Sequence, residues 1–350
     1  MSVHHKDDRN MRIDAFTHIY TTEYLRALRN DCPGIELKTD ALTGKTTIVD
    51  RASGEVTNFL FANSAFDGLE ERLAVMDRLK IDRQVLTAAQ PTIDPTQLHV
   101  SNNKTIELAK IINDSMVKLV QGFEDRFILV AEIPTLEMAE ALMETERAVQ
   151  ELGMKGIQLN TTIGGKPLDS PEFRPIFAKA TKLNIPILIH PCNVAKYERR
   201  NYETQYGLHR ILGWPFETSL AMARLVFGGI LSEYPSLKIV THHTGGMIPF
   251  FANRIESFYA RELAKILSIA KGPKEYFGKI FYDTATEGNV PALNCASDMF
   301  GSERLVFGTD YPFRNVSEVH SIIEAVSKMD VTEEEREAIF GGNASDLFRL

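Results

Sequence analysis

Short runs of β-branched and other apolar residues recur along the chain, and each is followed by a longer amphipathic stretch. The runs lie at residues 13–16, 84–88, 127–132, 156–160, 185–189, 237–241, 279–283 and 304–308. Strands that alternate with helices in this way form parallel sheets, because each helix packs back onto the strands that it connects. Eight such units indicate a closed (β/α)8 TIM barrel more than an open sheet, and the 350 residues suit one barrel domain spanning 1–350.

One stretch, from about residue 21 to 66, interrupts this alternation. Turn signals such as Cys32-Pro33-Gly34 and Thr43-Gly44-Lys45 lie next to strand-like pieces such as Thr46–Val49. We therefore expect a small β-rich insertion after the first strand. Helices are expected at 67–79, 101–121 and 135–152, the first of them capped by Asp67, and another begins at Pro171.

Polar residues follow four of the expected strands: His18, His190, the pair His242 and His243, and Asp310. The carboxyl ends of barrel strands meet at one face, where such folds keep their chemistry. Imidazole and carboxylate groups together suit a divalent metal, and a catalytic metal needs about three protein ligands. His18, His190 and Asp310 supply three, which leaves His243 as a general acid or base.

Each of these residues also has a structural interpretation. A lone histidine at a strand end is more often a hydrogen-bonded structural residue than a ligand, and Asp310 could simply cap the next turn. If strand alternation continues to its end, His242 points away from His243, so we expect His242 to be structural. Asp14, inside the first strand, is either a buried hydrogen-bonding anchor or a substitute ligand.

Composition excludes several other classes of protein. The net charge is −8 with no basic stripe, so a nucleic-acid partner is not expected. No apolar run reaches the roughly 20 residues that span a bilayer, and the polar start is not a secretory signal. The 3 cysteines are widely spaced and odd in number, which predicts reduced thiols in a cytoplasmic protein.

A long connection from Pro191 to Trp214 follows the fifth strand and is rich in Tyr, Arg and Glu. Loops of this length on the catalytic face of a barrel are commonly lids or walls of a substrate pocket. We expect Trp214 to contact the substrate. The alternative is a solvated surface excursion.

Several segments together carry a family resemblance: IDAFTHIY, NIPILIHP, LGWPFETSLAMARLVFGGILSEYPSLKIVTHHTGGMIPFFANRIESF, LVFGTDYPF and GNASDLF. The chain resembles the amidohydrolase-related (amidohydrolase 2) family, and within it the 2-amino-3-carboxymuconate-6-semialdehyde decarboxylase branch. The resemblance covers nearly the whole chain. It implies a TIM-barrel enzyme with one divalent metal, most often a decarboxylase of an unsaturated or aromatic acid, and commonly a homodimer.

The resemblance also implies roles for residues of this chain. His18, His190 and Asp310 match metal ligands, and His243 matches the acid–base residue. Arg254 is expected to contact a substrate carboxylate, in a neighbouring subunit's site. Phe313 matches a pocket aromatic residue.

Two positions depart from the pattern. The first strand should carry His-x-His or Glu-x-His, but it reads Phe16-Thr17-His18, so one metal ligand is missing. The second departure is Leu60, where relatives carry an arginine that binds the substrate carboxylate.

We therefore expect a metal-dependent, non-oxidative decarboxylase of an unsaturated or hydroxyaryl carboxylic acid. Zn²⁺ is the expected ion, with Mn²⁺ as an alternative. The same residues would also serve a hydrolase or hydratase that uses a metal-bound water. A further alternative is a metal-free protein that binds a small ligand.

Overall fold

The computed structural model describes residues 11–350 except 43–45, 52–55, 61–67, 193–204 and 268. Its main feature is a sheet of eight strands in the order β1-β5-β6-β7-β10-β11-β12-β13, all pairing in parallel. These strands are β1 (Ile13–Ile19), β5 (Arg83–Ala88), β6 (Phe127–Ala131), β7 (Gly156–Asn160), β10 (Pro186–His190), β11 (Lys238–Thr241), β12 (Phe281–Asp283) and β13 (Leu305–Val306).

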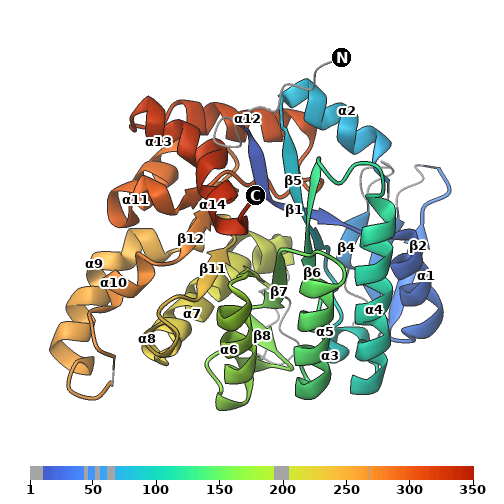
Figure 1. Cartoon of the computed structure of the whole chain (residues 1–350), viewed down its shortest axis with the longest axis horizontal. Coiled ribbons are helices and arrows are strands. Elements are labelled where there is room, and N and C mark those ends of the chain that lie inside the picture. The colour runs from blue at the N-terminus through green and yellow to red at the C-terminus, as the bar shows by residue number, and fades with distance from the viewer. Residues whose placement is uncertain (1–10, 43–45, 52–55, 61–67, 193–204, 268) are drawn as a thin grey trace.

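The last strand region returns to the first and closes the barrel. The Ala15 amide donates to the Phe307 carbonyl at 2.7 Å, and the His18 amide donates to the Tyr311 carbonyl at 2.7 Å. Helices surround the strands (Figure 1), so the predicted (β/α)8 TIM barrel is confirmed. The larger helices are α2 (Glu70–Leu79), α4 (Asn102–Leu119), α5 (Met138–Gln150), α6 (Arg174–Leu183), α7 (Trp214–Phe227), α9 (Ile248–Phe258), α11 (Val290–Phe300) and α12 (Val316–Ser327).

The barrel strands read as nearly continuous apolar runs because both of their faces are buried. One face packs against the helices, in the larger of two core clusters. The other face forms a separate inner core, and α14 (Asn343–Phe348) contributes Leu347 and Phe348 to it. Several polar side chains are buried near the carboxyl ends of the strands, among them His18, His190 and Asp310.

Between β1 and α2 the chain forms α1 (Thr22–Asp31) and an antiparallel sheet of β2 (Ile35–Thr39), β3 (Thr46–Asp50) and β4 (Val56–Leu60). This sheet falls within the stretch predicted to be a β-rich insertion. The side chain of Leu60 and the expected helix cap Asp67 lie outside the described residues, as does much of the connection from Pro191 to Trp214.

Smaller elements include α3 (Pro95–Leu98), β8 (Thr162–Ile163), β9 (Lys166–Pro167), α8 (Ile230–Glu233), α10 (Pro273–Phe277) and α13 (Glu333–Glu337), together with short 3-10 and π-helical turns. Among the residues that the structure describes, no helix combines the length and apolar character needed to cross a membrane.

Candidate metal centre and active site

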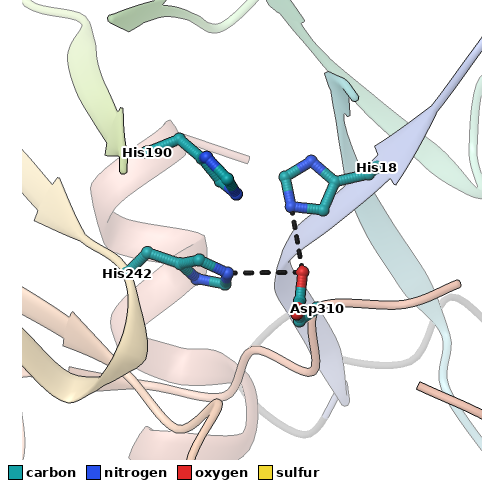
Figure 2. A group of neighbouring side chains, drawn as sticks. All are labelled: His18, His190, His242 and Asp310. Atoms are coloured by element: carbon teal, nitrogen blue, oxygen red, sulfur yellow. Dashed lines mark ion pairs between the residues drawn. The ribbon is translucent and has the colours of Figure 1, made fainter. Parts of the chain in front are cut away.

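Four side chains converge at the carboxyl ends of the barrel strands: His18, His190, His242 and Asp310 (Figure 2). One donor atom from each lies within 4.8 Å of the others, and all four residues are buried. His18 belongs to β1 and His190 ends β10, whereas His242 and Asp310 follow β11 and β13. Three imidazoles and one carboxylate form a donor set suited to Zn²⁺ or a similar divalent ion.

The presence of His242 in this cluster corrects the expectation that it points away from the site. Alternation predicts opposite directions for two successive side chains only while the backbone stays extended. His242 is extended, with φ −83° and ψ 162°, but His243 and Thr244 both have φ of +53°. The left-handed turn ends the alternation, and the rings of His242 and His243 lie 3.9 Å apart between centroids.

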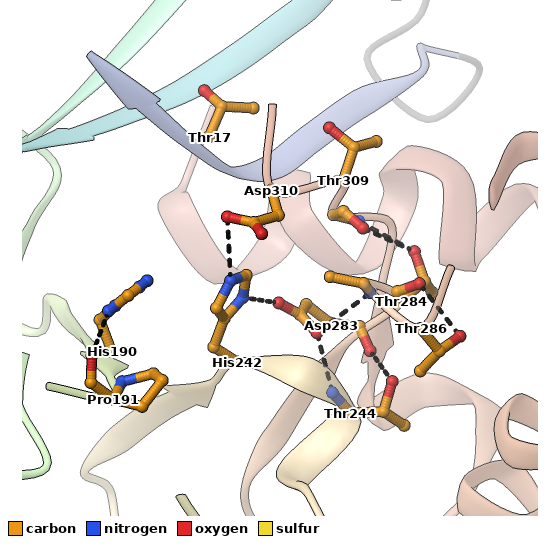
Figure 3. Close-up of polar contacts among 12 residues, drawn as sticks. Thr17, His190, Pro191, His242, Thr244, Asp283, Thr284, Thr286, Thr309 and Asp310 are labelled. Atoms are coloured by element: carbon orange, nitrogen blue, oxygen red, sulfur yellow. Dashed lines mark hydrogen bonds and ion pairs between the residues drawn. The ribbon is translucent and has the colours of Figure 1, made fainter. Parts of the chain in front are cut away.

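The hydrogen bonds of His190 and His242 define which nitrogen of each ring carries the proton. Nδ1 of His190 lies 2.6 Å from the Pro191 carbonyl oxygen, which can only accept. Nδ1 of His242 is hydrogen-bonded to the Asp283 carboxylate (Figure 3). Both rings therefore carry a proton on Nδ1, which in the neutral form leaves a lone pair on Nε2.

His18 reaches the same state through two threonines. Its Nδ1 lies 2.9 Å from the Thr87 hydroxyl. That hydroxyl donates its hydrogen to the Thr17 carbonyl at 3.0 Å, so it must accept from the histidine. All three imidazoles thus have an anchored Nδ1, the arrangement typical of metal-binding histidines.

Nε2 of His18 and Nε2 of His242 are buried and have no hydrogen-bond partner in the described part of the chain. Each faces the same carboxylate oxygen, Asp310 Oδ1, at 3.2 and 3.4 Å respectively. Buried polar atoms without a partner cost free energy, so a native structure normally supplies one. A cation between these atoms would satisfy both nitrogens and the carboxylate.

Electrostatics at the cluster favour positive charge near Asp310. Burial tends to raise the pKa of Asp310, but His18, His242 and the Arg314 charge hold it well below its usual value. Burial lowers the pKa of His190 well below its usual value. For His242, Asp283 and Asp310 outweigh burial and raise the pKa to about 9.

Asp283, at the end of β12, holds the turn that carries the two histidines. Its Oδ1 accepts from the Thr244 amide at 2.9 Å and from the Ala285 amide at 3.2 Å, while Oδ2 binds His242. Its carbonyl oxygen accepts from the Thr244 hydroxyl at 2.8 Å. Figure 3 shows this network beside the cluster. Asp283 therefore fixes the orientation of the His242 ring.

The position of Asp310 depends on Asp14 and Arg314. Asp14 accepts from the Thr309 amide at 3.0 Å and from the Thr309 hydroxyl at 2.6 Å, so it anchors the residue next to Asp310. It is not part of the four-residue cluster. Arg314 Nη2 lies 3.1 Å from Asp310 Oδ2 and 2.5 Å from Glu287, at the edge of the site.

Aromatic residues flank the cluster. The Trp214 ring lies 5.8 Å from His190 and is stacked 6.3 Å from His243. Phe313 lies 5.5 Å from His18, on another side. His243 borders the cluster without belonging to it, and burial followed by the neighbouring charge of His242 lowers its pKa well below the usual value.

The predicted residues thus differ in where they lie. His18, His190 and Asp310 come together, and His243, Trp214 and Phe313 border them. Arg254 is instead exposed on α9. Sequence reasoning missed the place of His242 and gave Asp283 and Arg314 no role. The adjacent glycines after the histidine pair were the signal that a turn ends the alternation there.

Comparison with known proteins finds several relatives at the sequence level, two of which are decarboxylases at 32% identity. The chain is 32% identical over 282 residues to a 2-amino-3-carboxymuconate-6-semialdehyde decarboxylase of Dictyostelium discoideum, covering 80% of this chain and 76% of the relative. It is also 32% identical over 295 residues to a gamma-resorcylate decarboxylase of Rhodococcus jostii, covering 80% of this chain and 87% of the relative.

Among solved structures, a dihydroxybenzoic acid decarboxylase from a Polaromonas species, with bound manganese and the inhibitor 2-nitroresorcinol, shares the fold. Its TM-score is 0.80 at 24% sequence identity, with 97% of each chain covered. The amidohydrolase family model, Amidohydro_2, matches residues 31–350. With a match over most of its length and a barrel of the same fold, the chain belongs to the amidohydrolase 2 family.

Proposed function

We propose that the chain is a divalent-metal-dependent, non-oxidative decarboxylase of an unsaturated or hydroxyaryl carboxylic acid. The observation that carries this proposal is the buried cluster of three imidazoles and one carboxylate at the barrel mouth. The two sequence relatives support the reaction type, because both are named decarboxylases and each is 32% identical to this chain.

The donor set fits a metal ion, since all three histidines have Nδ1 anchored and Nε2 available. The proposed ligands include His18, His190 and Asp310, which lie in the cluster and also match metal ligands of the family. Zn²⁺ is the ion we expect, and Mn²⁺, which the Polaromonas relative contains, is the alternative. The ion would act as a Lewis acid that holds a substrate oxygen and stabilises negative charge as carbon dioxide leaves.

The flanking residues suit a planar substrate. Trp214 lies beside His190 and Phe313 lies beside His18, so aromatic faces on which a planar ring could stack are present next to the cluster. These aromatic neighbours support a hydroxyaryl acid as the substrate.

His243 is the proposed acid–base residue. Because its pKa is lowered, the free enzyme holds it neutral at pH 7. The substrate binds as a carboxylate, and His243 takes up the required proton from solvent once this negative charge lies beside it. The carbon–carbon bond to the carboxylate then breaks, carbon dioxide leaves, and the electron pair stays on the ring carbon. The proton held by His243 forms the new carbon–hydrogen bond.

The test is to incubate the metal-loaded protein with a panel of hydroxyaryl and unsaturated acids and to measure carbon dioxide release. Release by wild type, lost in His190→Ala and Asp310→Ala together with the metal, is the expected result. Metal-loaded wild type that releases no carbon dioxide, but adds water or hydrolyses bonds in parallel panels, would establish the hydratase or hydrolase alternative. Wild type without metal, even after supplementation, would favour a binding protein.

A further inference from the structure

Phe16 occupies a position in the first strand where a second metal ligand is expected. Its ring stacks on His242, with centroids 4.2 Å apart and planes at 26°. It also lies 5.6 Å from His18 and 6.1 Å from His190. The side chain is fully buried, so an apolar ring with no donor atom fills one wall of the cluster. The first strand therefore provides one imidazole instead of two.

His242 brings a donor atom to the same cluster from a different strand. Its Nε2 lies 3.4 Å from Asp310 Oδ1 and has no hydrogen-bond partner among the described residues. The Phe16 ring supports one face of the imidazole, and Asp283 binds its Nδ1. The ring is thus held from two directions with its free nitrogen toward the centre.

We propose that His242 replaces the missing first-strand ligand, so that the metal is bound by His18, His190, His242 and Asp310. This inference rests on the proposed metal-dependent function and specifies its metal site. Phe16 and His242 are in contact, and in this pair the first strand lacks a ligand while the residue after β11 supplies one. Asp283 acts as the positioning residue for His242, as carboxylates commonly do for metal-binding histidines.

The adjacent His243 has a different role from His242. The left-handed backbone at His243 turns the chain, so both histidines border the site although they are consecutive. His242 is anchored by Asp283, whereas Nδ1 of His243 is buried without a hydrogen-bond partner in the described structure. One ring is therefore fixed as a ligand, while the other is available for proton transfer.

The experiment measures zinc content and zinc affinity in wild type, His242→Ala, Phe16→His, and the double variant Phe16→His/His242→Ala. We expect wild type to bind one zinc and His242→Ala to bind it more than about 100-fold more weakly, since even indirect partners of a ligand are worth roughly 10–100-fold. The double variant should regain affinity, because a histidine at position 16 restores the first-strand ligand. His243→Ala is the matched control and should retain wild-type affinity.

A second measurement needs no variant and covers the case in which His242→Ala misfolds. X-ray absorption of the zinc-loaded wild type counts the coordinating imidazoles at about 2.0–2.1 Å. Three imidazoles support the inference and two overturn it, as does full zinc affinity in a folded His242→Ala. Three imidazoles without carbon dioxide release would reject only the proposed reaction. Carbon dioxide release by an enzyme with two imidazoles would reject only this ligand set.

Discussion

At the scale of single residues, neighbouring histidines differ in how tightly their rings are held. His242 donates from Nδ1 to Asp283, whereas His243 is stacked near Trp214 and its Nδ1 has no hydrogen-bond partner among the described residues. Burial also lowers the pKa of His243, so it is neutral under ordinary conditions. A neutral, unanchored imidazole beside a metal cluster suits proton transfer better than ligation.

Replacing His243 by Asn tests this assignment. We expect kcat to fall by about 10²–10⁴-fold, the usual contribution of a general acid or base, while zinc content stays at the wild-type level. Steady-state kinetics and elemental analysis on the same preparations measure the two effects. His320→Asn, at an exposed histidine on α12, is the control and should change neither. Loss of zinc in His243→Asn would contradict the proposed role.

Glu132 lies directly after β6. It tests how burial at the barrel mouth changes the pKa of a carboxyl group. Burial raises its pKa to about 8, although Gln158 donates to it at 2.7 Å. Between the unfolded value near 4.5 and about 8, the folded protein holds a proton that the unfolded chain has lost. The free energy of unfolding therefore falls as pH rises through this window, by about 1.4 kcal/mol per pH unit for this group.

Glu132→Gln removes this titration and keeps an acceptor oxygen for Gln158. Relative to wild type, the variant should gain stability progressively from about pH 5 to pH 8, by the linkage relation. Chemical denaturation at several pH values gives the difference directly. Glu146→Gln, at an exposed glutamate on α5, is the control. A stability difference between Glu132→Gln and wild type that does not change with pH would show that Glu132 is ionised in the folded protein.

At the scale of elements, the loop after β13 places Asp310 by means of its neighbour Thr309. The Thr309 hydroxyl donates to Asp14 in β1 at 2.6 Å and accepts from the Tyr311 amide at 3.2 Å. This hydroxyl thus links two elements that are distant in sequence. Its removal leaves Asp14 and the Tyr311 amide each short of a buried partner, which costs about 1–3 kcal/mol.

We expect Thr309→Val to weaken zinc binding by roughly 10-fold, as loss of a residue that supports a ligand commonly does. Competition with a chelator measures the affinity, and thermal unfolding measures the accompanying loss of stability. Thr145→Val is the matched control, because its buried hydroxyl donates to the Ala141 carbonyl on α5, away from the cluster. Equal zinc affinity in both variants would mean that Asp310 does not need this anchor.

The elements themselves were largely predictable from the sequence, because buried parallel strands produce apolar runs that alternate with amphipathic stretches. Each predicted barrel strand overlaps a strand of the structure. The proximity of His18, His190 and Asp310 could be predicted because the carboxyl ends of barrel strands meet at one face. His242 could not be predicted in this way, since its direction depends on the left-handed turn at His243. Arg314 was missed because only the folded loop brings it to Asp310.

At the scale of the whole molecule, α9 presents a surface that the barrel does not use. Phe250 is 78% exposed, Phe258 47% and Phe251 39%, and the exposed Arg254 is on the same helix. Exposed clusters of large apolar side chains commonly mark protein–protein contacts. If this surface is the contact of the expected homodimer, the exposed Arg254 would face the site of the partner chain.

A dimer in which Arg254 completes the neighbouring site makes a specific prediction about mixed subunits. Arg254→Ala should lower kcat/KM by about 10–100-fold, because a hydrogen bond to a charged group is worth roughly 1.5–3 kcal/mol. His190→Ala should be inactive because it lacks a proposed metal ligand. Each mixed dimer then contains one intact site, made of the metal cluster from the Arg254→Ala chain and the arginine of its partner.

Refolding an equal mixture of the two variants should therefore recover about one quarter of wild-type activity, since half of the dimers are mixed and each has one working site. As a control, refolding Arg254→Ala alone should give no activity beyond the residual activity of that variant. An activity equal to the average of the two parents would mean that Arg254 serves its own chain's site or no site. Activity above that average requires a site built from the metal cluster of one chain and Arg254 of its partner. The same experiment therefore tests whether the protein is a dimer and which chain binds the substrate carboxylate.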